Sequence, residues 1–109
     1  MKGKIVLLPF PFTDLTTAKL RPALVIYEGE KDVIVAFISS KVSSRSPETN
    51  ILLTKERRGF RRTGLKVDSV IRVDKIATLL KDLVVGELGE VDEEIRKEVN
   101  QKLRKILKI

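Results

Sequence analysis

Apolar residues gather in short runs that polar or glycine-containing segments separate. Runs at 5–8, 23–27 and 33–38 predict three strands, and the turn around Gly29 predicts that the last two form a hairpin. The second and third runs are apolar on successive residues. This pattern predicts that both faces of these strands are buried, as in a barrel that packs against a further surface. Later apolar patterns predict a short strand over 50–54 and a longer one over 69–79, on either side of a basic turn or loop.

The end of the chain has the period of an amphipathic helix. Val91, Ile95 and Val99 recur every four residues, and Asp92 is the expected N-cap. Acidic residues follow in the first turn and basic residues in the last turn, which complements the helix dipole. The polar face mixes both signs of charge, so we expect the apolar stripe to pack on the strands and not on a membrane. The chain therefore predicts one domain, residues 1–109, of mostly β (α+β) class with a C-terminal helix.

Composition removes several kinds of chemistry. The chain has no cysteine and no histidine, so disulfides, thiolate nucleophiles and histidine bases are excluded, and a metal site is disfavoured. Its glycines form neither a phosphate-binding loop nor a nucleophile elbow, and we expect no cofactor. The first apolar run is too short for a signal peptide or a membrane span. We therefore expect a cytoplasmic protein that does not bind membranes.

The charge of the chain is concentrated in its middle third. The formal net charge is +7, and residues 41–72 hold nine basic side chains against three acidic ones. This distribution favours a nucleic-acid partner, with a merely solvated basic face as the alternative. RNA is cut without metal when its own 2′-hydroxyl attacks the neighbouring phosphate. Such an enzyme needs a proton acceptor and cations that stabilise the phosphorane.

Four polar residues are candidates for this chemistry. Arg72 and Asp74 lie two apart on one face of the predicted strand 69–79, where they form either a reactive pair or a structural ion pair. Arg21 precedes a wholly apolar strand, and Ser39 ends the next one. Strand ends commonly face a ligand groove, although an arginine there is often only solvated and a serine often bonds nearby backbone.

Three blocks carry a family resemblance: Gly3–Leu15, Lys19–Ile26 and Thr63–Leu79. In order and spacing they resemble the PemK/MazF family of toxins from type II toxin–antitoxin systems. The resemblance implies a small SH3-like β-barrel with a C-terminal α-helix, assembled as a homodimer. It implies metal-independent, sequence-selective cleavage of single-stranded RNA (mRNA), which a cognate antitoxin protein neutralises.

The resemblance also implies roles for individual residues. Arg21 would stabilise the phosphorane, Ser39 would donate to a phosphate oxygen, Asp74 would accept the 2′-hydroxyl proton, and Arg72 would hold Asp74 or the phosphate. Bases could stack on Phe12 or Phe60. The predicted contacts to the RNA backbone are Thr13, Lys19, Lys41, Arg45, Arg57, Arg58, Arg61 and Arg62.

Two other functions stay open at this point. A toxin of the same fold that binds DNA gyrase would not need Arg21, Ser39, Arg72 and Asp74 to converge. A non-catalytic RNA-binding barrel would use the same basic residues without an acid–base pair. Convergence of these four side chains is therefore the feature that favours cleavage.

Overall fold

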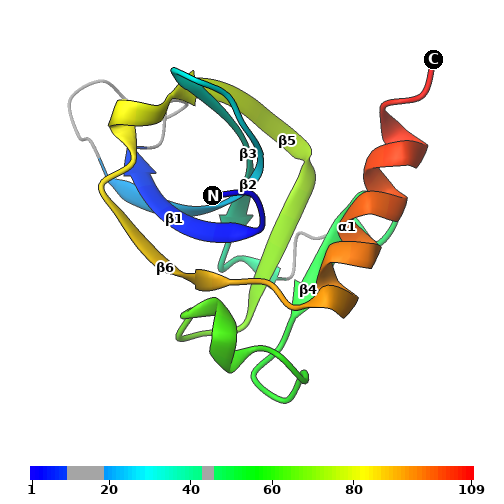
Figure 1. The fold of residues 1–109 in the computed structure, drawn as a ribbon. Helices are drawn as coiled ribbons and strands as arrows, with labels where there is room; N and C mark the ends of the chain where they lie inside the picture. Colours follow the sequence, from blue (N-terminus) through cyan, green and yellow to red (C-terminus); the bar gives the residue numbers. More distant parts are fainter. Residues whose placement is uncertain (10–18, 43–45) are drawn as a thin grey trace.

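The computed structural model describes residues 1–9, 19–42 and 46–109, and this part of the chain folds as one curled antiparallel sheet with a helix against it (Figure 1). The strand order is β4-β5-β3-β2-β1-β6, and the sheet forms a half-barrel, which confirms the predicted barrel-like, mostly β fold. The elements are β1 (Lys4–Pro9), β2 (Leu20–Glu28), β3 (Asp32–Ser39), β4 (Asn50–Leu53), the 3₁₀ turn η2 (Arg61–Thr63), β5 (Ser69–Leu80), the 3₁₀ turn η3 (Lys81–Leu83), β6 (Gly86–Glu90) and the helix α1 (Glu93–Ile106).

Apolar side chains fill both sides of the sheet. On the side that α1 covers, Leu24 and Ile71 pack in one cluster with Ile95 and Val99 of the helix. On the opposite side, a second cluster includes Phe37 and is built from β1, β2 and β3. Both faces of β2 and β3 are thus buried, as their apolar pattern predicts. The burial takes place within one chain, so this pattern gives no evidence for a second subunit.

The C-terminal helix forms as predicted. The carboxylate of Asp92 accepts a hydrogen bond from the backbone N–H of Ile95 at 2.9 Å, which satisfies one of the free donors at the helix start. An ion pair between Arg57 and Glu98 joins the turn after β4 to the helix. Within the described ranges, no helix is both long and apolar enough to cross a bilayer.

Two local features differ from the sequence-based expectations. The strand β6 was not predicted, and it pairs with β1 at the edge of the sheet. A side chain at Gly89 in this strand would collide with the backbone of η2, so the close packing of η2 on β6 requires a glycine. The basic turn contains Phe60, which is 6% exposed and belongs to the apolar core. The prediction that a base stacks on Phe60 is therefore wrong.

The long strand β5 carries an irregularity that shapes one end of the sheet. Ala36 of β3 pairs with Ile76, whereas its neighbour Phe37 pairs with Arg72, so residues 73–75 have no partner on β3. The backbone N–H of Val73 instead donates to the carbonyl of Thr49 at 3.1 Å, just before β4. Extra unpaired residues of this kind, a β-bulge, bend a strand and redirect its side chains. The corner in β5 is visible in Figure 1.

Candidate active site

A hollow of about 440 Å³ lies where β2 begins, β3 ends and β5 bends. Its walls contain three of the four residues that the sequence singles out for catalysis: Arg21, Ser39 and Arg72. Lys41, one of the predicted RNA contacts, also lines it. The complete lining is Arg21, Phe37, Ile38, Ser39, Lys41, Arg72 and Lys75.

The register of three neighbouring strands brings these side chains together. Ala23 of β2 pairs with Phe37 of β3, and Phe37 pairs with Arg72 of β5. Residues opposite one another in a sheet share a face, and residues two apart on a strand share it too. Arg21 and Ser39 lie two positions from Ala23 and Phe37, so they share the face of Arg72. Residues far apart in sequence therefore meet because of strand pairing.

Asp74 lies beside the hollow and not in its wall. Its Oδ1 is 3.6 Å from Nε of Arg72, so the two residues form an ion pair. The same oxygen accepts a hydrogen bond at 2.8 Å from Nδ2 of Asn50, a β4 residue that is only 3% exposed. Nε of Arg72 is buried, and no described residue accepts a hydrogen bond from it. A guanidinium held in this way has donors for a ligand oxygen in the hollow.

Ser39 is oriented by the backbone that follows it. Its Oγ accepts a hydrogen bond from the backbone N–H of Lys41 at 3.0 Å. A bond of this kind to nearby backbone is the alternative that the sequence analysis named for a serine at a strand end. A hydroxyl that accepts one bond still has a proton to donate. The observed contact therefore fixes the oxygen and is compatible with donation to a phosphate.

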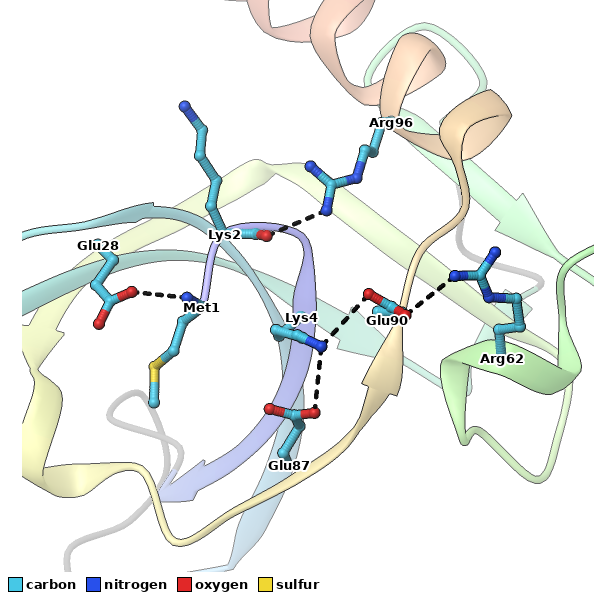
Figure 2. Close-up of polar contacts among 8 residues, drawn as sticks. All are labelled: Met1, Lys2, Lys4, Glu28, Arg62, Glu87, Glu90 and Arg96. Atoms are coloured by element: carbon cyan, nitrogen blue, oxygen red, sulfur yellow. Dashed lines mark hydrogen bonds and ion pairs between the residues drawn. The ribbon is translucent and has the colours of Figure 1, made fainter.

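The predicted RNA contacts in the basic turn lie away from the hollow, since none of the four arginines between 57 and 62 lines it. Arg57 is engaged by Glu98, and Arg62 donates to Glu90 at 3.0 Å. Figure 2 shows Glu90 between Arg62 and Lys4. Hydrogen bonds from these two cations, that of Arg62 foremost, hold the pKa of Glu90 below its ordinary value.

The remaining predicted contacts have mixed positions. Arg58 and Arg61 are exposed and belong to the same basic turn. Lys19 is exposed and directly precedes β2, two residues before Arg21. Thr13, Arg45 and Phe12 lie outside the described residues. The RNA contacts predicted from charge alone are thus divided between the surroundings of the hollow and a separate basic turn.

The family of this chain is shown by its sequence as a whole. Residues 1–107 match the sequence profile of the PemK-like, MazF-like toxins of type II toxin–antitoxin systems. This chain belongs to that family. The comparison with curated protein sequences gives no match.

Solved structures show the same fold for this toxin. It is 19% identical to an endoribonuclease in complex with its cognate antitoxin from a mycobacterial species, with a TM-score of 0.75 over 98% of this chain and 93% of that one. It is 16% identical to the Mycobacterium tuberculosis toxin MazF-mt6, with a TM-score of 0.74 over 95% of each chain. MazF from Deinococcus radiodurans is 21% identical, with a TM-score of 0.71 over 96% of this chain and 93% of that one.

The toxin has site residues that the sequence did not indicate. Lys75 is not among the predicted site residues, and regular alternation would place it on the opposite face of β5 from Arg72. Phe37 was assigned only to the core, yet it also lines the hollow. Asn50 carries no signal for its contact with Asp74, which depends on the pairing of β4 with β5.

A second hollow in the toxin, of about 70 Å³, lies between the N-terminal turn, β2 and α1. Arg96 at its edge donates to the carbonyl of Lys2 at 3.2 Å, a contact drawn in Figure 2. Its floor is mostly apolar and holds none of the predicted catalytic residues. Among the residues that the structure describes, no three histidine, cysteine, aspartate or glutamate side chains group as a metal site would require.

Proposed function

We propose that this toxin is an endoribonuclease that cuts single-stranded RNA, mRNA above all, at preferred sequences and without a metal ion. The observation that carries the proposal is the shared hollow of Arg21, Ser39 and Arg72. Two guanidinium groups and a hydroxyl that converge on one concave site match the charge and the acceptor oxygens of a phosphodiester. A toxin that only had to bind a protein surface would not need this convergence.

Each side chain has a role in the proposed reaction. The 2′-hydroxyl of the substrate attacks the adjacent phosphorus, the 5′-oxygen leaves and takes up a proton from water, and a 2′,3′-cyclic phosphate and a 5′-hydroxyl form. Arg21 and Arg72 stabilise the negative charge of the phosphorane, and Ser39 donates to one of its oxygens. Asp74 accepts the 2′-hydroxyl proton through the carboxylate oxygen that Asn50 does not hold.

The family and the structural neighbours support an enzyme. Two mycobacterial neighbours, each covering 98% of this chain, are endoribonucleases. The sequence supports metal independence, since it contains no histidine or cysteine to hold a transition metal. RNA that carries its own nucleophile needs only charge stabilisation and proton transfer, for which arginine, serine and aspartate are sufficient.

The partners of this toxin are also proposals. A cognate antitoxin protein is supported by the family and by the neighbour that was solved with its antitoxin. A cationic hollow predicts that the antitoxin presents acidic side chains to it and excludes RNA. The homodimer rests on the family resemblance, and the cytoplasmic location rests on a composition without cysteine, which fits a reducing compartment.

The proposal is tested by cleavage of a long single-stranded RNA in excess EDTA. The wild-type protein should give discrete fragments that end in 2′,3′-cyclic phosphate. Arg21→Ala should lower the rate at least about 100-fold, because it removes a charged donor from the transition state. Arg21 is exposed, so its loss should leave the fold intact. Lys97→Ala, on the exposed side of α1, is the matched control and should cut at the wild-type rate.

The same assay distinguishes the other candidate functions. RNA that stays intact but forms a complex with the protein would reject cleavage and support a binding barrel. Cutting that stops in EDTA would reject the metal-independent mechanism. RNA that is neither cut nor bound would direct attention to a protein target such as gyrase.

A further inference from the structure

The hollow contains more positive charge than one phosphodiester requires. Four of its seven lining residues are cations, and none is a carboxylate: Arg21, Lys41, Arg72 and Lys75. A single phosphodiester carries one negative charge, and two arginines already supply enough donors for its oxygens. Lys75 is therefore a cation beyond this requirement, placed in the lining where a neighbouring phosphate of the same strand can reach it. A chain of evenly spaced phosphates is the ligand that satisfies all four cations together.

Lys75 reaches this hollow only because β5 is irregular. In an unbroken strand, Arg72 and Lys75 are three residues apart and point to opposite faces. The unpaired residues 73–75 break this alternation, and both side chains line the same hollow. The contact of Val73 with Thr49 holds the bend in place. At this bend residues 73–75 lose their pairing with β3, and one further cation, Lys75, comes to line the hollow.

No other function of Lys75 is visible in the fold. Its side chain is exposed, and within residues 1–9, 19–42 and 46–109 it forms neither an ion pair nor a side-chain hydrogen bond. Asp74, the adjacent carboxylate, is paired with Arg72 and Asn50 instead. Lys75 is thus an exposed cation in the lining of a concave site, and that lining contains no carboxylate.

We propose that Lys75 binds a backbone phosphate next to the scissile one and holds the RNA strand in the hollow. The identity of this polyanion as RNA rests on the proposed function above. Lys75 is a binding residue and takes no part in bond breaking. A lysine contacts phosphate as a point charge without directional demands, so its effect is the same for every base sequence.

The proposal makes a quantitative prediction for binding. Each phosphate contact on a single strand contributes about 0.7 to the slope of log affinity against log salt. Loss of one contact should flatten the slope by that amount and weaken binding about fivefold at 0.1 M salt. The maximal cleavage rate should stay at the wild-type value, and KM should rise by the same factor, because the contact is made equally in the bound RNA and in the transition state.

The experiment compares Lys75→Ala, Lys75→Arg and the control Lys97→Ala. Fluorescence anisotropy measures their binding to a short 2′-O-methyl RNA, which lacks the nucleophile and stays intact, across a series of salt concentrations. The RNA carries a mapped cut site, or a mixed sequence if no cut is found. Lys75→Ala should show the weaker binding and the flatter slope, while Lys75→Arg and Lys97→Ala should match the wild type. The exposed position of Lys75 predicts unchanged thermal melting in all three variants.

The outcomes separate this inference from the proposed function. Wild-type cleavage together with unchanged binding and slope in Lys75→Ala would overturn the role of Lys75 alone. Weaker binding by Lys75→Ala in a protein that does not cut RNA would support the phosphate contact and reject the nuclease. Failure of the wild-type protein to bind the 2′-O-methyl RNA would overturn the inference. A loss in maximal rate without a change in KM would also overturn it, because Lys75 would then act in catalysis.

Discussion

The buried amide of Asn50 links stability to the geometry of the candidate site, which makes Asn50→Leu an informative substitution. Asn50 is 3% exposed, and its Nδ2 donates to Asp74 at 2.8 Å and to Oγ1 of Thr49 at 3.2 Å. Its Oδ1 accepts from the backbone N–H of Ser46 at 2.9 Å. Leucine has a similar size and removes all three hydrogen bonds, so the substitution tests their contribution with little change in packing.

The expected loss follows from these contacts. A hydrogen bond to a charged group contributes about 1.5–3 kcal/mol and a neutral one about 1 kcal/mol. The side chain of Asp74 is 37% exposed, so water replaces part of the hydrogen bonding that Asn50 supplied. The lower end of the range for a bond to a charged group therefore applies. We therefore expect Asn50→Leu to lower the free energy of unfolding by about 3–4 kcal/mol. For a chain of this length, that loss lowers the melting temperature by about 15 °C.

Urea unfolding followed by circular dichroism measures the effect. Asn100→Leu is the matched control, because Asn100 is exposed on α1 and its substitution should change stability by less than about 0.5 kcal/mol. At a temperature where both variants are folded, Asn50→Leu should also cleave RNA more slowly than Asn100→Leu, since Asp74 has lost a positioning contact. Equal unfolding free energies for the two variants would refute the reasoning.

Two further predictions concern other parts of the fold. Hydrogen bonds, first from Lys81 and then from the amino terminus (Figure 2), lower the pKa of Glu28 from 4.5 to about 2. The stabilisation from Glu28 is therefore complete above pH 4.5 and is lost as the pH falls toward 2. In chemical unfolding, the stability difference between the wild type and Glu28→Gln should shrink over that pH range. A difference that stays constant from pH 7 to pH 2.5 would contradict this prediction. Gly64→Ala should lower the free energy of unfolding by at least about 1–2 kcal/mol, because Gly64 has a φ of 76° and a Cβ there would collide with the carbonyl of Leu88. Gly86→Ala, where nothing lies near the added Cβ, is its control, and equal melting temperatures would argue against the explanation.

Features that depend on nearby residues were predictable from the sequence. The C-terminal helix, its Asp92 cap and its buried stripe follow from a four-residue period and from one side chain at the helix start. The apolar strands were recognised for the same reason. By contrast, β6 is short and contains two glycines and two glutamates, so neither composition nor alternation marks it as a strand. It exists because β1 offers an edge for it to pair with.

Features that depend on strand pairing were harder to predict from the sequence. Arg21, Ser39 and Arg72 are candidates one by one from their places along the sequence, and the resemblance adds their roles. The register of β2, β3 and β5 is what places them in one hollow. Residues 73–75 of β5 have no partner on β3, but the apolar pattern predicts one unbroken strand over 69–79, so the sequence does not reveal the irregularity. The sequence therefore does not predict that Lys75 joins the site. Phe60 was predicted to be a site residue and is not one. An aromatic residue among basic residues suggests base stacking, but the side chain of Phe60 is enclosed in the apolar core.

The central claim is that RNA supplies its own nucleophile in the hollow of Arg21, Ser39 and Arg72. The most direct test uses two copies of one short RNA that contains a mapped cut site, one of them with a single 2′-deoxy nucleotide at the attacking position. Under single-turnover conditions in EDTA, the wild-type protein should cut the all-ribose strand at that site and leave the 2′-deoxy strand intact, while binding both with similar affinity. Cleavage of the 2′-deoxy strand at the same position and rate would contradict the account, since the attacking oxygen would then come from elsewhere.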